Sequence, residues 1–165
     1  MNYADLEKRL IHPDPADRRD AMISLATLGD DAAPTMIAWL SHPDWRIRRA
    51  AAIYADHHPD PNLLARLRLT LHDPKAKVRM WAVHSLGCEP CKPGGNPIDP
   101  VPALVHALET DKAPRVRRMA AAMLSQQPGH RVVRALRRAR TREEDPGVLA
   151  IVTWALATSE RLGCR

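Results

Sequence analysis

A short pattern that recurs five times along the chain constrains its fold more than any other feature. Each copy opens with a turn rich in Asp and Pro and continues into an Ala-rich segment, as in "DPKAKVRMWAVHSLGC" from Asp73 to Cys88. The other copies begin at Asp14, His42, Asp111 and Glu144. Periods of about 20 to 50 residues are typical of stacked supersecondary units, each too small to bury its own apolar face.

The copies align on a residue pair that follows each turn. These pairs are Arg18-Arg19, Ile47-Arg48, Val78-Arg79, Val116-Arg117 and Val148-Leu149, at steps of 29, 31, 38 and 32 residues. Four residues beyond the first member stand Met22, Ala51, Ala82, Ala120 and Val152, and eight beyond it stand Ala26, Ala55, Leu86, Leu124 and Leu156. Because positions i, i+4 and i+8 share one face of a helix, this stripe predicts the seam along which helices stack.

A second, shorter set of helical segments lies between the copies. It comprises residues 4–11, 33–41, 62–71, 100–110 and 130–140. Pro beside Asp marks many of the separators, as expected of helix N-termini, and no run of alternating β-branched residues predicts a strand. We therefore predict an all-α fold, an α-solenoid of about five helical hairpins. The repeats would span residues 1–29, 30–58, 59–87, 99–127 and 128–165, with an insertion at 87–99.

A turn with Asp-Pro, followed by Val-Arg and an Ala-rich helix, resembles the HEAT repeat family, especially the short form of bacterial lyase-like repeats. The resemblance covers nearly the whole chain. It implies that the turn Asp and the helix Arg interact along the stack. The residues involved would be Asp14, Asp44, Asp73 and Asp111 with Arg19, Arg48, Arg79 and Arg117. The last copy carries Leu149 in place of the Arg, which fits a terminal cap.

The 38-residue step contains the Gly- and Pro-rich insertion, which predicts a loop between repeats. Cys88 and Cys91 form a Cys-x-x-Cys pair there, and His84 lies one helical turn before Cys88. A structural zinc site needs four ligands, and a second Cys-x-x-Cys is missing from the sequence. Loop thiols without a metal, a metal site and redox chemistry all stay open, and we expect neither a stoichiometric metal nor a cofactor.

Positive charge is concentrated in one region of the chain. From Lys112 to Arg142 there are ten Lys or Arg and no Asp or Glu, whereas the net charge of the chain is +6. Outward positions of repeats two to four carry Arg46, Arg49, Lys77, Arg115 and Arg118. We expect these to form a basic surface, with Trp81 beside it and an extension formed by Arg131, Arg134 and Arg138. Such a field favours an anionic partner, either nucleic acid or protein, and increased solubility is the alternative explanation.

No enzymatic signature accompanies the repeats. The HEAT-like deoxyhypusine hydroxylases bind iron through His-Glu pairs, and the sequence has no His-Glu dipeptide. HEAT-like DNA glycosylases place a carboxylate on their inner surface, and only Asp17 and Asp20 are candidates for it. We predict a non-catalytic binding module. The alternatives are a protein–protein interaction scaffold without nucleic-acid affinity and a glycosylase-like DNA-repair protein.

The sequence also bears on location. The N-terminus lacks the apolar core of a secretory signal, and no window approaches the roughly 18 apolar residues of a membrane span. The apolar side of the basic segment 130–140 is required for stacking, so we expect no membrane insertion. Three cysteines, an odd number, do not indicate a disulfide framework. We therefore expect a cytoplasmic protein.

Overall fold

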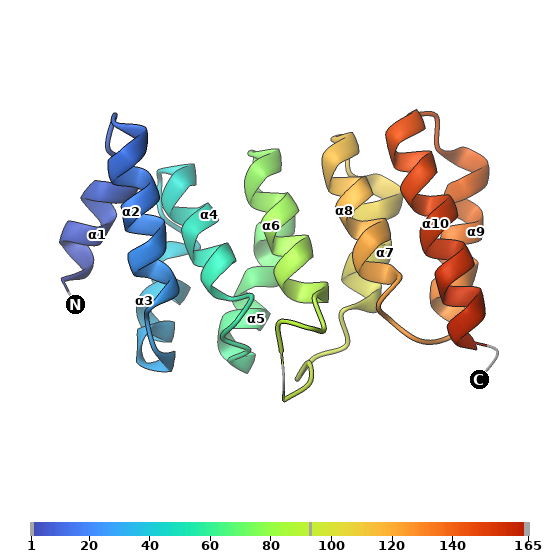
Figure 1. Ribbon diagram of the computed structural model, residues 1–165, viewed down its shortest axis with the longest axis horizontal. Coiled ribbons are helices and arrows are strands. Elements are labelled where there is room, and N and C mark those ends of the chain that lie inside the picture. The colour runs from blue at the N-terminus through green and yellow to red at the C-terminus, as the bar shows by residue number, and fades with distance from the viewer. Residues whose placement is uncertain (1, 93, 164–165) are drawn as a thin grey trace.

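The computed structural model describes residues 2–92 and 94–163 as a row of helices (Figure 1). In chain order these are α1 (Tyr3–Leu10), α2 (Pro15–Ala26), α3 (Ala33–Trp39), α4 (Trp45–Tyr54), α5 (Pro61–Leu67), α6 (Ala76–Gly87), α7 (Val101–Thr110), α8 (Pro114–Leu124), α9 (His130–Arg142) and α10 (Pro146–Gly163). Short 3-10 turns at Asp30–Ala32 and Arg68–His72 precede α3 and extend α5. The described residues form no strand, which confirms the all-α prediction.

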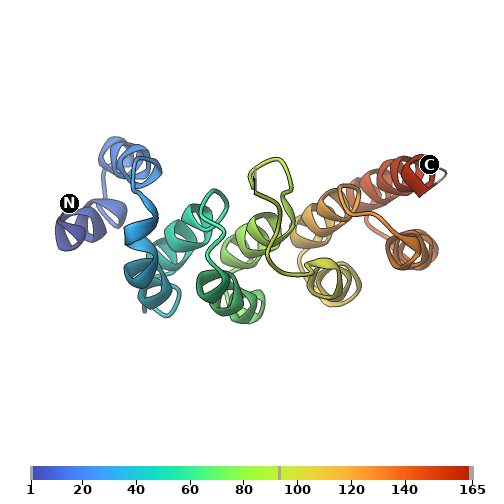
Figure 2. The same ribbon diagram turned by 90° about the horizontal axis from the view of Figure 1, so that it is seen from below.

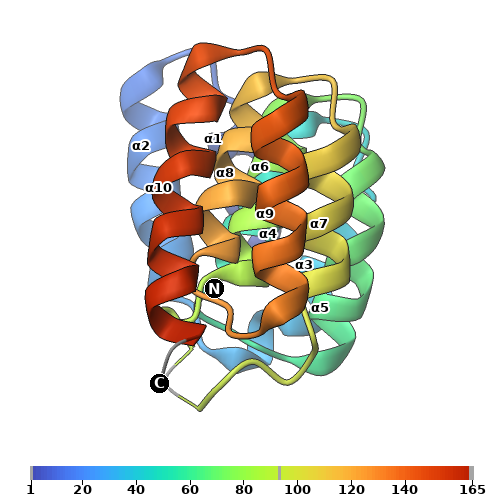
Figure 3. The same cartoon turned by 90° about the vertical axis from the view of Figure 1, so that its right-hand side faces the viewer.

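The helices alternate between two layers. The front layer consists of α2, α4, α6, α8 and α10, which face the viewer in Figure 1, and the back layer consists of α3, α5, α7 and α9 (Figures 1 and 2). The view along the row shows the two layers edge on (Figure 3). All front-layer helices begin at the upper edge of Figure 1 and end at the lower edge. This arrangement is the predicted α-solenoid, and it places equivalent residues of successive repeats in rows.

Small and aliphatic side chains fill the seam between neighbouring helices. In repeats two to five, the residues predicted for this seam are all buried. They are Ala51, Ala82, Ala120 and Val152, and one turn further on Ala55, Leu86, Leu124 and Leu156. Because these side chains are short, α6 and α8 pack closely against their neighbours.

The first repeat is shifted by one residue from the predicted alignment. Ala21 and Leu25 are buried there, whereas Ala26 is exposed. The residue equivalent to Arg48 is therefore Arg18, and the prediction that Arg19 occupies this position is wrong. Arg19 lies on the exposed side of α2 instead.

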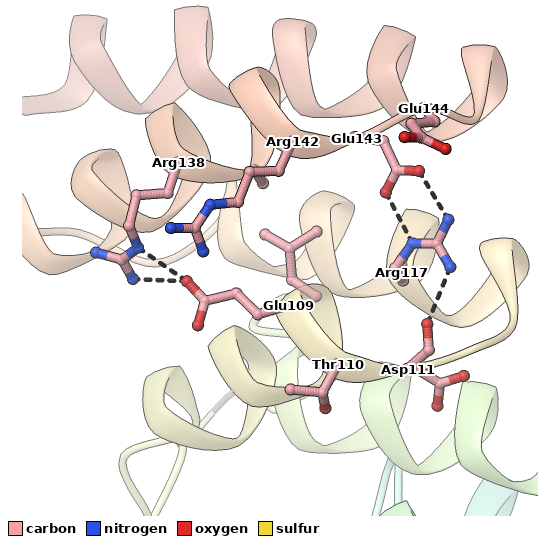
Figure 4. A pocket seen from close by; sticks show the side chains of 10 residues that line it. Glu109, Thr110, Asp111, Arg117, Arg138, Arg142, Glu143 and Glu144 are labelled. Carbon is pink, nitrogen blue, oxygen red and sulfur yellow. Dashed lines mark hydrogen bonds and ion pairs between the residues drawn. The ribbon is translucent and has the colours of Figure 1, made fainter.

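Arginines at one helical position connect successive repeats. Arg79 donates two hydrogen bonds to Asp111, with N···O distances of 2.6 and 2.9 Å. Arg117 donates two to Glu143, both at 2.7 Å (Figure 4). Arg48 binds Asp73 in the same way, at 2.5 and 3.1 Å. Each guanidinium also donates to a carbonyl of the turn before its own helix, so every arginine of this ladder ties two consecutive turns together.

The acids of the ladder differ in part from those that the resemblance implied. Asp14 and Asp44 lie two residues after the position from which Asp73 and Asp111 bind their arginines. There they accept hydrogen bonds from backbone amides and cap α2 and α4. Their assignment to the ladder is wrong. The acid position of repeats three to five holds Asp73, Asp111 and Glu143, whereas repeats one and two have His12 and His42 there. Arg18 accordingly donates to carbonyl oxygens of its own turn.

Ion pairing shifts the titration of the ladder acids. Hydrogen bonds from Arg117 lower the pKa of Glu143 below its ordinary value, although burial acts in the opposite direction. Burial acts to raise the pKa of Asp111, but hydrogen bonds from Arg79 and from the Ala113 amide outweigh it and lower this pKa overall. The ladder acids therefore stabilise the fold in their charged form.

A charge placed in the seam should destabilise the array. We expect Ala82→Glu and Ala120→Glu each to lower the free energy of unfolding by about 3–5 kcal/mol, because the carboxylate would be buried without a partner. Urea unfolding followed by circular dichroism measures the change. Ala65→Glu on the exposed side of α5 is the matched control and should stay near wild type. Seam variants as stable as this control would show that another face is buried.

The ladder predicts a pH-dependent stability difference. Glu143→Gln should cost about 1–3 kcal/mol at neutral pH because it removes a charged hydrogen-bond acceptor. A lowered folded-state pKa means that this contribution is complete above the unfolded pKa of about 4.3 and is lost as the pH falls through the folded value. The difference between wild type and variant should thus shrink below about pH 4. Glu144→Gln, at the exposed neighbouring position, is the control, and a pH-independent difference for Glu143→Gln would contradict the prediction.

Candidate binding face

A groove of about 670 Å³ opens where α2 approaches α4. Its lining includes Arg18 and Met22 of α2, Trp45, Arg46 and Arg49 of α4, and Lys77 of α6. Residues 10–13, which lead from α1 towards α2, close one side. Four cationic side chains from three helices therefore line one groove together with an indole ring.

Trp45 organises the cations of this groove. It is the first residue of α4, directly after the N-cap Asp44. The Arg46 guanidinium lies 5.1 Å from the centre of the Trp45 ring system, and the Lys77 ammonium lies 5.4 Å from it. Cations at this distance from an indole are attracted by its π electrons. The ring thus holds two positive charges from neighbouring repeats close together.

The basic surface continues from the groove towards α8. Trp45 and Lys77 also line a second hollow of about 260 Å³, together with Lys75, Ala76 and Arg115. Arg118 lies further along α8, where its Nη1 is 4.0 Å from the point that a Cβ on Gly147 would occupy. We use the term basic face for the cations that line these two hollows from α2, α4, α6 and α8, with Arg118 further along α8: Arg18, Arg46, Arg49, Lys77, Arg115 and Arg118.

Few acids neutralise the groove. The Asp44 carboxylate lies 3.4 Å from the Arg46 Nη1, but it also caps α4. Burial lowers the pKa of Arg49, which indicates a partly desolvated cation. The ladder position of the next repeat holds His42 rather than an acid, and Arg18 donates to the carbonyls of His12 and Pro13 instead. The groove is therefore a region where an added anion would find unbalanced positive charge.

Five of the predicted anion-binding residues lie on front-layer helices, and three do not. Arg131, Arg134 and Arg138 belong to α9 in the back layer. Arg131 pairs with Asp99 at 2.9 Å, and Arg138 pairs with Glu109 at 2.7 Å. Although residues 112–142 contain no acid, acids just outside this segment in sequence are its spatial neighbours and pair with two of its arginines. Figure 4 shows the Arg138 pair in a hollow whose charges are largely matched.

The predicted aromatic and acidic candidates have structural surroundings. Trp81 is partly buried, packs against the core and stands edge-on to His84 at 5.2 Å between ring centres. Asp17 lies 2.7 Å from the His12 Nδ1, and Asp20 is exposed on α2. With the corrected alignment, the outward positions of repeat one hold Ala16 and Arg19 instead of these acids. Sequence reasoning did not include Arg18 among the binding residues. The available signal was His42, because a histidine at the ladder position of the second repeat offers Arg18 no acid.

The three candidate metal ligands gain a fourth neighbour in the structure. His84, Cys88 and Cys91 lie together, and Asp56 from the end of α4 joins them. A second Cys-x-x-Cys is indeed missing, but Asp56 is a fourth potential ligand that the sequence did not indicate. Burial is the largest effect on Asp56 and acts to raise its pKa. Hydrogen bonding from His84 and Cys91 and the positive charge of Lys92 outweigh burial, so the pKa of Asp56 is lowered overall.

The fold and the row of basic side chains define a helical-repeat protein with a patterned surface. A family model described as HEAT repeats matches residues 3–87 and 64–157, so the chain belongs to the HEAT repeat family. This confirms the resemblance found in the sequence. No curated protein matches the chain. Among the described residues, no helix has the combined length and apolar character required to cross a membrane.

Two crystal structures of engineered proteins, both targets of the Northeast Structural Genomics Consortium, share the fold. The first is 17% identical with a TM-score of 0.55, and the match covers 96% of this chain and 81% of that one. The second is 18% identical with a TM-score of 0.54, covering 96% and 79%. At this level of identity the likeness concerns the fold alone.

Proposed function

We propose that this HEAT-repeat protein is a non-catalytic binding module whose basic face engages the phosphate backbone of a nucleic acid. The observation that carries the proposal is the groove that Arg18, Arg46, Arg49 and Lys77 line together with Trp45. Arginine and lysine on such a surface attract phosphates through charge, without a sequence motif. We place this activity in the cytoplasm, where the thiols of Cys88 and Cys91 would remain reduced.

The dimensions of the basic face support a duplex as the ligand. It extends over four front-layer helices, from α2 to α8. Packed helices lie about 8–10 Å apart, so the face spans roughly 24–30 Å. One turn of B-form DNA measures about 34 Å, which is comparable. A single turn of duplex would therefore meet most of the six cations.

The surroundings of Trp45 favour binding that is independent of base sequence. Its ring is already in contact with Arg46 and Lys77, so it is occupied by cations rather than free to stack on a base. Contacts to phosphate position a nucleic acid but read no sequence. We do not extend the proposal to base excision, because Asp17 is engaged by His12 and neither it nor Asp20 holds an outward position of the aligned repeats.

The proposal predicts salt-dependent binding that two charge reversals weaken. We would measure fluorescence anisotropy of a labelled duplex and a labelled RNA strand across a salt series. The double variant Arg46→Glu, Lys77→Glu should lose at least about tenfold in affinity, and its log–log salt slope should fall by about two, since each phosphate contact contributes about 0.9.

The control is the double variant Arg134→Glu, Arg140→Glu on α9, which changes the net charge equally on exposed back-layer positions. It should bind within about threefold of wild type if the basic face is the site. Equal losses in both double variants would point to non-specific attraction. If the wild type shows no binding at low salt, nucleic acid is ruled out and an acidic protein becomes the preferred partner.

A further inference from the structure

Four metal-binding side chains converge near the lower edge of the front layer. Asp56 directly follows the C-cap Ala55 of α4, and His84 lies in the last turn of α6. Cys88 is the C-cap of α6, and Cys91 lies in the insertion that follows. One ligand atom from each residue lies within 4.8 Å of all the others. Two repeats and the insertion therefore meet at one point.

Two polar atoms of this cluster are buried without a hydrogen-bond partner. Only three such side-chain atoms occur in the described part of the chain, and two of them are Asp56 Oδ1 and His84 Nδ1. The Asp56 side chain is 5% exposed. A buried acceptor without a partner is costly, and proteins rarely retain one without a reason. The other oxygen and nitrogen of these side chains, Asp56 Oδ2 and His84 Nε2, lie 3.1 Å apart, and a cation held between them would offset the cost of burying the carboxylate.

The position of Asp56 also favours positive charge nearby, and Lys92 supplies one such charge. The C-terminal end of a helix carries partial negative charge, so a carboxylate is repelled there. Asp56 stands at this end of α4 and donates its backbone amide to Ile53. Two cysteine sulfurs lie beside it, and these become anionic when they bind a metal. Such a concentration of acceptors and potential thiolates is stable when a positive ion lies at its centre.

The distance between Asp56 and His84 is close to the ligand spacing around a tetrahedral zinc ion, whereas the two sulfurs lie about 1 Å closer together than that spacing. With bonds of about 2.3 Å to sulfur and 2.0–2.1 Å to nitrogen and oxygen, neighbouring ligand atoms lie roughly 3.3–3.8 Å apart. Asp56 Oδ2 lies 3.1 Å from His84 Nε2, and the two sulfurs lie 2.7 Å apart. Movements of about 1 Å in these side chains would complete the geometry.

We propose that Asp56, His84, Cys88 and Cys91 form a binding site for one Zn²⁺ ion. Two sulfur, one nitrogen and one oxygen ligand suit zinc better than magnesium or calcium, which prefer oxygen throughout. Four protein ligands leave no position for substrate, so the site is structural. On binding, the two thiols each release a proton to solvent, and zinc forms one bond to each resulting thiolate.

Lys92 completes the charge balance of the site. Two thiolates and one carboxylate around Zn²⁺ leave one net negative charge, which is unfavourable when buried. Lys92 is only 2% exposed, and its ammonium donates to the Cys88 carbonyl at 2.9 Å. The Asp56 carboxylate is already an anionic neighbour of Lys92, and the zinc–thiolate centre would keep one net negative charge beside this buried lysine.

Zinc would fasten the insertion to the array. The backbone of Glu89 already donates to Gln126, Gln127 donates to the Gly87 carbonyl, and Asn96 donates to Leu86. These contacts anchor the loop to α6 and to the end of α8. The metal adds a link to α4 through Asp56, so it joins repeat two to repeat three. Independently of nucleic-acid binding, the ion would stabilise the stacking at the long repeat.

A redox-active cysteine pair fits the surroundings less well. Reactive Cys-x-x-Cys motifs gain a low thiol pKa from a helix N-terminus, whereas Cys88 and Cys91 follow a helix C-terminus. Cys88 is buried and Cys91 is half-buried, whereas reactive thiols are exposed to their substrates.

The first test uses the full-length wild type with reduced thiols. We would remove metal, add Zn²⁺ or Co²⁺ and measure stoichiometry by elemental analysis and absorption. We expect one equivalent, tetrahedral ligand-field bands of Co²⁺ and a sulfur-to-cobalt charge-transfer band with the intensity of two thiolates. A chelator should lower Tm. A reduced protein that binds no stoichiometric zinc and gives no cobalt spectrum would overturn the proposal.

Variants then identify the ligands. Asp56→Asn should weaken Co²⁺ binding by more than the roughly 10–100-fold typical of a supporting residue and alter the ligand-field bands, while the two-thiolate band persists at saturation. Cys88→Ser should lose half of that band. Cys164→Ser is the cysteine control and should retain wild-type affinity. If Asp56→Asn binds like wild type, the assignment of Asp56 as fourth ligand is wrong.

A disulfide between Cys88 and Cys91 is the remaining competitor, and thiol titration distinguishes it. A protein isolated oxidised that binds one zinc equivalent after reduction supports the proposal. If the reduced protein still binds no zinc, or if its stability depends only on the disulfide, the zinc proposal is refuted. Since this readout involves no nucleic acid, its outcome is separate from that of the proposed function.

Discussion

The hydrogen-bonded contact between an arginine and the acid of the next turn determines how successive repeats are placed. Apolar seams alone allow helices to slide and rotate, because dispersion and hydrophobic contacts have little direction. A guanidinium that binds a carboxylate with two hydrogen bonds and the preceding carbonyl with a third has a fixed orientation. From Arg48 to Glu143 these contacts align the N-terminal turns of the front layer. Residues at equivalent positions therefore form a row, and the basic face is the row next to the ladder. In the second repeat His42 replaces the acid, and Arg18 donates to carbonyls of its own turn instead of to a carboxylate of the next one. The groove lies between α2 and α4, where this link between repeats is missing.

Periodicity in the sequence was sufficient to predict the fold and the stacking seam, because both follow from helical spacing. It failed by one residue in the first repeat, where Arg18 and Arg19 are adjacent and either can be aligned with Arg48. Burial of Ala21 resolves the choice, and burial depends on packing against the neighbouring helices. The turns were harder to interpret. Asp44 and Asp73 each stand beside a proline, yet one caps its own helix and the other binds the preceding repeat. A shift of two positions within a turn changes the role of the carboxylate, and composition does not reveal that shift.

The candidate sites were predictable to the extent that their residues share one helix. Arg46 and Arg49 follow from the outward positions of a single repeat. The partners of Arg131 and Arg138 do not, because Asp99 and Glu109 lie about one repeat earlier in the chain. Asp56 was missed for the same reason, since 28 residues separate it from His84. In a solenoid the lateral neighbours of a side chain lie one period away, so a search for ligands within eight residues found His84, Cys88 and Cys91 but not Asp56. An aspartate at a helix C-terminus, where its charge is disfavoured, was the signal available in the sequence.

The two proposed sites use opposite ends of the same helices. The ladder contact between Arg48 and Asp73 holds α4 to α6 at their N-terminal edge, beside Trp45 and Lys77. The cluster of Asp56 and His84 joins the same two helices at their C-terminal edge. A helix pair tied at one end can still pivot about that tie, whereas a pair tied at both ends keeps its crossing angle. The interval between repeats lengthens to 38 residues directly after α6, and the insertion begins where the second tie would form. A metal at this point would compensate for the irregular spacing and keep the cations of neighbouring repeats in one row.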